Sequence, residues 1–321
     1  MTNPNAPQDP HVPQGYLPPA NAYYQPAQPG ADSMDPLINP PNTGINGWFT
    51  RIGWLLRRSW KSMLVIFAIT HILPAIGFAA IGVVAFLAAG ATAMPWLISQ
   101  SELDPDQVES PELPEWLGFG LATLIVVILL LVIILVIMEL AGYAAATYAV
   151  TREATGQQVR LGEALGYGFK RSIGMFGWQI LVFLLIVAGA IACVLPAFYV
   201  YAATALFGPI YLFERANPIG RSFSIFNNNL GRVLGRLAII LALSIVAGMV
   251  GNVFGIVGDL MTGSSSDPTL LIAAAVISSV FSLVIQLPVT MFTFAGVLLT
   301  YTEQRGYESQ VNTGQLAAEL G

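Results

Sequence analysis

The chain has little cysteine, histidine or charge. One cysteine, Cys193, in 321 residues excludes an internal disulfide and a cysteine-based metal cluster. The two histidines show no metal-ligand spacing, and the chain has no glycine-rich phosphate loop and no serine or cysteine with a plausible base, so we expect no enzyme and no cofactor. Only 10% of the residues are charged, whereas a soluble domain has about 25%. The composition therefore excludes an ordinary soluble protein.

Long uncharged runs take the place of the missing charge, and the mean hydropathy is +0.68. The run from Met175 to Phe213 would be roughly 58 Å long as one helix, nearly twice a bilayer core of about 30 Å. Basic residues flank both of its ends, so a hairpin that turns near Pro196 is expected. We predict six membrane spans, at about 63–90, 117–145, 174–194, 197–214, 234–257 and 270–300.

All 13 lysines and arginines fall on one side of this topology. Basic residues in short loops set orientation, so we expect both termini in the cytoplasm of a bacterial plasma-membrane protein. A five-span alternative would place Arg215 to Arg236 outside, against the same rule. The basic residues lie in small groups beside apolar runs, so no nucleic-acid partner is expected. Eight acidic residues fall on the outer side: Glu102, Asp104, Asp106, Glu109, Glu112, Glu115, Asp259 and Asp267.

The two ends of the chain differ from the apolar middle. Residues 1–44 contain 11 of the 21 prolines and no lysine or arginine, which predicts a disordered proline-rich cytoplasmic tail. Such a tail is either a plain solvated segment or a ligand for partner proteins. Residues 45–305 are predicted to form the membrane domain, and 306–321 a second cytoplasmic tail. No cleavable signal peptide is expected, because no charged segment precedes an apolar stretch at the N-terminus.

Three amphipathic segments precede the three pairs of spans, beginning at Trp48, Val159 and Asn217. In each, apolar residues recur at helical spacing and basic residues take much of the other face, which is typical of helices in the membrane interface. Asn217 before Pro218 is typical of a helix N-terminus. We therefore predict an all-α integral membrane protein of three units, each a cytoplasmic interfacial helix followed by a transmembrane hairpin.

Three stretches also carry a family resemblance: TREATGQQVRLGEALGYGFKR (151–171), VLPAFYVYAATALFGPIYLFE (194–214) and RANPIGRSFSIFNNNLGRVLGR (215–236). With the Leu195–Pro196 turn, they resemble the membrane domain family of bacterial glycerophosphoryl diester phosphodiesterases, over roughly residues 45–305. Stand-alone members often carry a proline-rich tail. The resemblance implies a multi-helix membrane module of mostly unassigned function. It does not imply phosphodiesterase chemistry, because His11 and His71 cannot supply that enzyme's metal-binding set.

Four polar residues within the predicted spans are candidate intramembrane sites: Glu139, His71, Asn252 and Gln286. An ionisable group inside a span is costly and often marks an ion or proton path. The alternatives are structural. Glu139 lies near the cytoplasmic end of a long span and is able to pair with an interfacial arginine. His71 is able to act as a hydrogen-bonded packing residue, and Asn252 and Gln286 are able to hydrogen-bond between helices.

Four arginines are candidate contacts for anionic lipid headgroups: Arg171, Arg215, Arg221 and Arg232. The alternative is that they retain the loops in the cytoplasm and form local ion pairs. Two functions then remain open. The first is a non-enzymatic scaffold or regulator of membrane and envelope processes, with partners bound through the proline-rich tail. The second is a carrier of a lipid or small molecule, which requires a cavity near Glu139, Asn252 or Gln286.

Overall fold

The computed structural model describes residues 35–40, 43–101, 115–214, 216–263, 267–309 and 311–320. Within these ranges the chain is almost entirely helical and has no strand. The elements are α1 (Gly44–Phe67), the π-helical segment η2 (Ala68–Ile72), α2 (Leu73–Ser101), α3 (Glu115–Ala154), α4 (Leu161–Ala192), α5 (Val194–Thr204), α6 (Phe207–Phe213), α7 (Pro218–Asn228), α8 (Leu230–Thr262), α9 (Pro268–Glu308) and α10 (Thr313–Glu319).

In the described part of the chain, six helical stretches are long and apolar enough to cross a membrane. This confirms the predicted number and is the make-up of a multi-pass membrane protein. The stretches are Gly44–Ala85, Ala122–Ala154, Leu161–Ala192, Val194–Phe213, Leu230–Val253 and Thr269–Glu308. Most of the predicted acidic outer loop, residues 102–114, lies outside the described part of the chain, and Glu115 opens α3.

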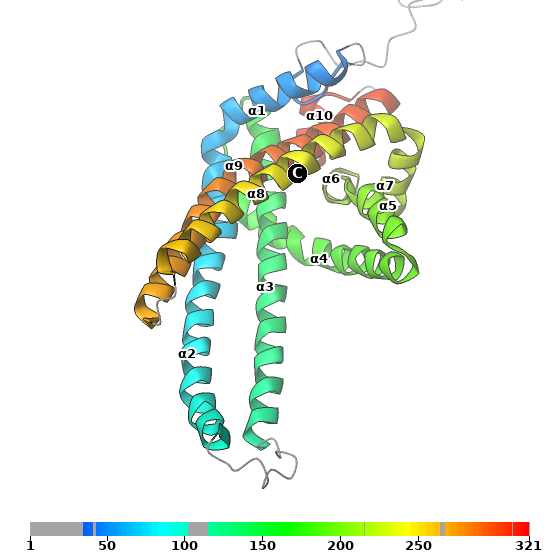
Figure 1. Ribbon diagram of the computed structural model, residues 1–321. Helices are drawn as coiled ribbons and strands as arrows, with labels where there is room; N and C mark the ends of the chain where they lie inside the picture. The colour runs from blue at the N-terminus through cyan, green and yellow to red at the C-terminus, as the bar shows by residue number, and fades with distance from the viewer. Residues whose placement is uncertain are drawn as a thin grey trace, which may run out of the picture.

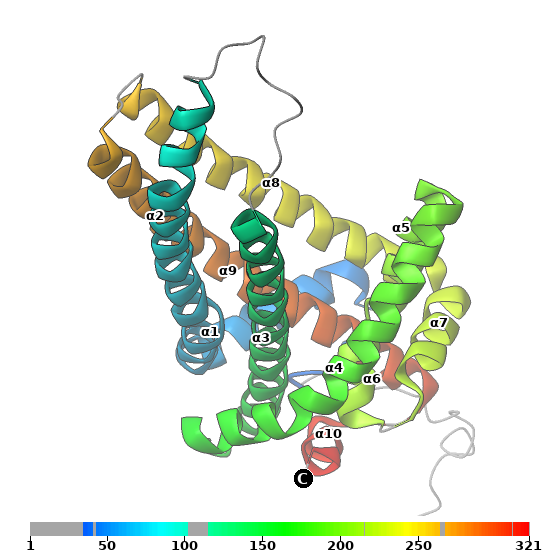
Figure 2. The same ribbon diagram turned by 90° about the horizontal axis from the view of Figure 1, so that it is seen from below.

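The helices form a packed base from which three pairs of helices diverge (Figure 1). Figure 2 shows the same arrangement from below: α2 with α3, α4 with α5, and α8 with α9 leave in different directions. We define the base as the described residues within 35–67, 140–175, 203–240 and 291–320, and the arms as the described residues within 73–139, 176–202 and 241–290. Apart from Val182 and Ala247, the buried hydrophobic side chains described all belong to the base.

The arms expose large apolar side chains on every side. Ile191 of α4 is 83% exposed and Leu260 of α8 is 76% exposed. A helix that is hydrophobic all round would aggregate in water but is solvated by lipid tails. The arms are therefore built to contact the bilayer, and the base is built to contact itself.

The helix is interrupted between the third and fourth candidate spans, close to the predicted turn. Cys193 is extended, with φ −178° and ψ 161°, and α5 begins at Val194 with Pro196 in its first turn. Here α5 packs back along α4. A Cβ on Gly189 would lie 3.0 Å from the backbone nitrogen of Ala197, so glycine permits this close approach.

The three amphipathic segments fold differently from one another. The first forms α1, which continues through η2 into α2, and the second forms the first turns of α4. The third is a separate helix, α7, which Asn229 divides from α8. The predicted cap is confirmed, because the Asn217 side chain accepts a hydrogen bond from the Gly220 backbone at 3.1 Å.

Both predicted tails need correction. Most of the predicted disordered segment, 1–34, lies outside the described residues, but residues 35–40 are packed into the base, where Leu37 and Ile38 are 1% and 0% exposed. Asp35 accepts hydrogen bonds from the backbone of Leu37 and Ile38 and from Thr313 of α10. The average composition of residues 1–44 does not reveal this short apolar pair, so it did not predict the packing.

The C-terminal segment 306–321 is likewise not a tail throughout. Helix α9 runs to Glu308, and α10 packs on the base with Leu316 fully buried. Asn312 and Gln315 cap α10 reciprocally, which satisfies its first backbone donors. The described part of the folded domain therefore extends beyond the predicted 45–305 at both ends.

Candidate functional site

A cavity of about 770 Å³ lies between the arm helix α2 and the pair α8–α9. On the α2 side its wall is apolar and made largely of small residues. On the opposite side, hydroxyl and amide groups interrupt the apolar wall. The lining residues are Ala75, Ile76, Ala79, Ala80 and Val83 of α2, Gly251 and Asn252 of α8, and Ile272, Val276, Ser278, Ser279, Val280 and Ser282 of α9. We call this cavity the arm groove.

The polar wall of the arm groove follows from close packing of α8 on α9. A Cβ on Gly251 would lie 3.2 Å from the Ser282 hydroxyl oxygen, so the glycine brings the two helices into tight contact here. Asn252, the next residue, is exposed and lines the groove. The arrangement offers hydrogen-bonding groups on one side and apolar surface on the other, which suits a ligand with both characters.

The structure separates the four predicted intramembrane residues. Asn252 lines the arm groove, whereas Gln286 is an exposed residue of α9 and is not among its lining residues. Glu139 is exposed on α3, and the ion pairs within the described residues do not include it. The structure therefore forms no cluster of Glu139, His71, Asn252 and Gln286.

His71 contacts residues of its own helical stretch, beside the place where Thr70 packs on α3. Its Nδ1 lies 3.0 Å from the Thr70 hydroxyl, and its ring meets Phe67 edge-on at 5.3 Å. Thr70 in turn lies against Gly142 of α3, where a Cβ would be 2.2 Å from the threonine Oγ1. These contacts support the structural alternative for His71.

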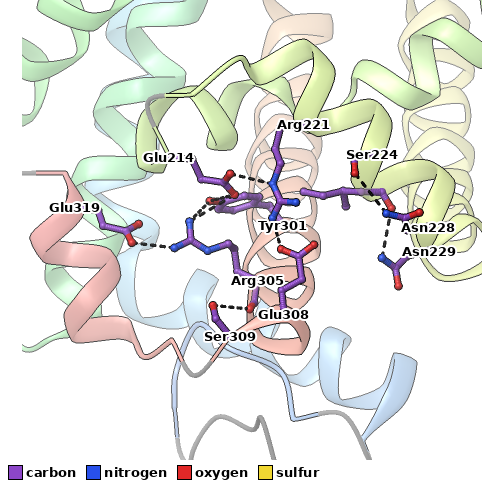
Figure 3. Close-up of polar contacts among 11 residues, drawn as sticks. Glu214, Arg221, Ser224, Asn228, Asn229, Tyr301, Arg305, Glu308, Ser309 and Glu319 are labelled. Carbon is purple, nitrogen blue, oxygen red and sulfur yellow. Dashed lines mark hydrogen bonds and ion pairs between the residues drawn. The ribbon is translucent and has the colours of Figure 1, made fainter.

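At the base, a cluster of charged groups joins α6, α7, α9 and α10 (Figure 3). Glu214 accepts hydrogen bonds from Arg221 Nε at 3.0 Å and from the Tyr301 hydroxyl at 3.1 Å. Arg221 also pairs with Glu308. Arg305 donates to the Tyr301 hydroxyl and to Glu319, both at 2.9 Å.

This cluster contains more carboxylates than guanidinium groups: Glu214, Glu308 and Glu319 against Arg221 and Arg305. Burial lowers the pKa of Arg221, but its hydrogen bonds to Glu308 and Glu214 and their charges outweigh that effect and raise the pKa overall. Arg221 is thus neutralised by its own chain. It ties α7 to α9 and has little spare charge for a lipid phosphate.

The other predicted headgroup arginines have different surroundings. Arg215 lies outside the described residues. Arg232 is exposed and stands 3.9 Å from the centre of the Tyr307 ring. Arg171 lies 5.6 Å from the centre of the Tyr167 ring and lines a second cavity, near the linker between α6 and α7.

Sequence reasoning missed a buried ion pair in the base. Arg236 of α8 and Glu303 of α9 approach to 2.6 Å with exposures of 4% and 0%. Asn39 donates to the same carboxylate at 3.0 Å and accepts from Arg51 at 3.3 Å. The pair therefore locks the N-terminal segment onto α8 and α9, although Glu303 has the sequence signature of an ordinary polar helix end.

Among the residues that the structure describes, no group of three or more histidine, cysteine, aspartate or glutamate side chains is placed to hold a metal ion. No known family model matches the chain, and neither the curated proteins nor the solved structures contain a match.

Proposed function

We propose that this chain is a multi-pass membrane protein that binds, and carries within the bilayer, an amphipathic lipid-like molecule in the arm groove. The observation that supports this proposal is the groove itself, about 770 Å³ beside Asn252. That volume is typical of small-molecule sites, which are roughly 300–1,000 Å³. The groove lies between apolar arms that diverge from the base, so lipid molecules surround it.

The chemistry of the groove restricts its ligand. The alanines of α2 suit a methylene chain, because they present apolar surface without bulk. Asn252 and the serines of α9 suit a hydroxyl, ester or amide group, whose desolvation must be offset by hydrogen bonds. We propose binding without catalysis, so the bound molecule leaves unchanged.

The proposed topology places the base on the cytoplasmic side of a bacterial plasma membrane. It is supported by the charge pattern, since the lysines and arginines all fall on one side of six spans. The same proposal includes the three units of interfacial helix and hairpin. It also includes membership of the membrane domain family of bacterial glycerophosphoryl diester phosphodiesterases. The parallel repeat would relate the units about an axis along the membrane normal.

A groove-filling substitution tests the binding proposal. Ala79→Phe places an aromatic ring in the groove, whereas Ala85→Phe makes the same change at an exposed alanine of α2 that is not part of its lining. Lipids retained by each purified protein are identified by native mass spectrometry, and transfer of a fluorescent lipid is measured in vesicles. We expect Ala79→Phe to lose both signals and Ala85→Phe to keep them. Equal retention and transfer by both variants and the natural chain would refute the proposal.

A scaffold or regulator is the second candidate, favoured by the docking of residues 35–40. This segment joins the proline-rich stretch to the buried ion pair through Asn39, so any partner held by that stretch is tethered to the base. Affinity purification of the full chain and of a chain lacking residues 1–34 tests this. The candidate predicts membrane or envelope proteins that co-purify only with the full chain, and identical sets of proteins would exclude it.

A further inference from the structure

A second cavity, of about 500 Å³, lies between α4 and the linker that joins α6 to α7. It is lined by Arg171 and Trp178 of α4, Tyr211 of α6, and Ala216 and Asn217 of the linker. We call it the α4 pocket. It is separate from the arm groove, which no part of α4 lines.

The positions of these side chains follow from helix geometry. Arg171 and Trp178 are seven residues apart on α4, which places them two turns apart on one face. Gly174, between them, leaves room for Tyr211, since a Cβ there would lie 2.0 Å from the tyrosine hydroxyl oxygen. Asn217 is held by its cap to α7, which uses its side-chain oxygen.

The arginine of the α4 pocket differs in its neighbours from the arginines of the base cluster. Among the residues that the structure describes, the pocket lining contains one guanidinium group and no carboxylate. Arg171 contacts the ring of Tyr167 and, within the described residues, forms no ion pair. Arg221, by contrast, is paired with two carboxylates.

Donor groups surround this positive charge. The lining side chains contain the guanidinium N–H groups of Arg171, the indole N–H of Trp178, the hydroxyl of Tyr211 and the amide NH₂ of Asn217. An anion with several acceptor oxygens matches this set, and the planar fork of arginine binds two phosphate oxygens at once. Tryptophan and tyrosine are also enriched at the level of lipid headgroups.

We propose that the α4 pocket binds a phosphate group, with Arg171 as its anchor. The phosphate comes either from an anionic phospholipid headgroup or from a soluble phosphate compound. This inference does not depend on the arm groove, so either proposal can fail while the other stands.

The experiment compares Arg171→Gln with Lys170→Gln in the full chain. Lys170 is the exposed neighbour and lies outside the pocket lining, so its loss removes the same charge from the same region. Each protein is placed in nanodiscs of phosphatidylcholine with and without phosphatidylglycerol, and bound phosphatidylglycerol is counted by native mass spectrometry. A second arm titrates inorganic phosphate against the protein in phosphatidylcholine alone.

A lipid source predicts that Arg171→Gln weakens phosphatidylglycerol binding roughly tenfold, the effect of one charge-assisted contact, and that Lys170→Gln changes it less than about twofold. A soluble source predicts the same loss for inorganic phosphate, with phosphatidylglycerol unaffected. If neither probe distinguishes Arg171→Gln from the natural chain, the proposal is overturned.

Two milder variants keep the test decisive where Arg171→Gln fails to fold. Arg171→Lys retains the charge without the fork and is expected to bind severalfold more weakly than arginine. Tyr211→Phe removes only the hydroxyl and is expected to weaken binding about threefold or more, in line with a neutral hydrogen bond. Unchanged affinity of both variants for phosphatidylglycerol and for inorganic phosphate would also overturn the proposal.

Discussion

The base and the arms use the same apolar residues in opposite ways. Ile225 of α7 is fully buried in the base, whereas Ile191, at the tip of α4, is 83% exposed. In water such an exposed isoleucine would be unfavourable, but lipid tails are as apolar as the protein interior. Hydrophobicity alone therefore does not indicate where this protein packs, and the packing is found where polar and charged residues accompany the apolar ones.

The base combines its core with hydrogen-bonded polar groups that join segments far apart in the sequence. Thr302 donates to the Leu37 carbonyl at 2.6 Å, and the Trp48 indole donates to Thr300 at 3.2 Å. Each of these bonds joins α9 to a segment far away in the sequence. The sensitivity of the protein to substitution should accordingly fall from the base toward the arm tips.

The largest loss of stability is expected from Glu303→Ala. Removing this carboxylate leaves Arg236 buried without its partner, which typically costs about 3–5 kcal/mol. The free energy of unfolding in mild detergent measures the loss. As a control, Glu308→Ala removes a carboxylate that is 37% exposed, for which we expect less than about 1 kcal/mol. Similar losses from both variants would mean that the buried pair contributes no more to the stability of the base than an exposed pair does.

A double variant sharpens this result. Replacing Arg236 and Glu303 together by methionine removes both charges and leaves an apolar contact. Because a buried pair can be exchanged for apolar residues at little cost, the double variant should be more stable than Glu303→Ala alone. A double variant less stable than the single one would show that further groups depend on the pair.

The next largest effect compares the two isoleucines directly. Ile225→Ala creates a cavity in the base and should cost about 2–5 kcal/mol. Ile191→Ala changes only a lipid-facing surface and should stay within about 0.5 kcal/mol. Thermal unfolding of both variants in nanodiscs measures the difference, and equal shifts would contradict the division between base and arms.

A smaller effect is expected at the junction between the base and the first arm. Gly142→Ala places a methyl group where the Thr70 side chain now lies, and overpacking of this kind costs about 1–3 kcal/mol. Gly77→Ala, on α2 with open space around it, should be neutral or slightly stabilising. Adding Thr70→Ala to Gly142→Ala should recover part of the loss, and no recovery would place the strain elsewhere. Unfolding midpoints of the four proteins provide the measurement.

The sequence predicted the features that depend on local pattern. Six apolar stretches, the cap at Asn217 and the break near Pro196 each follow from residues within one or two helical turns, so composition and spacing suffice. The docking of residues 35–40 does not. Asp35 meets Thr313 and Asn39 meets Glu303 across 278 and 264 positions, and a single sequence has no signal for pairs that distant.

The candidate sites likewise divide into residues that the local sequence pattern identifies and residues whose role depends on distant contacts. Asn252 was identifiable as a polar group in an apolar helix, and it lines the arm groove. Its serine neighbours on α9 were not, because serine is common within membrane helices. Arg171 and Arg221 look equivalent in sequence, since both lie beside an apolar run. Only their surroundings separate them, because Glu214 and Glu308 neutralise Arg221.

The smallest expected effect comes from Arg232, one turn before the buried Arg236 on the same helix. Arg232 is exposed over the Tyr307 ring, so Arg232→Gln should cost only about 0.5–1 kcal/mol, the value of an exposed cation–π contact. Arg232→Lys keeps a cation and should lose less, whereas Arg236→Lys cannot reproduce the two contacts of Arg236 with Glu303 and should lose more. The unfolding free energies of these three variants compare an exposed arginine with a buried arginine on the same helix. If Arg232→Gln proved as damaging as Arg236→Lys, burial would not decide what an arginine contributes to the base, and the expected difference between exposed and buried charges in the base would be wrong.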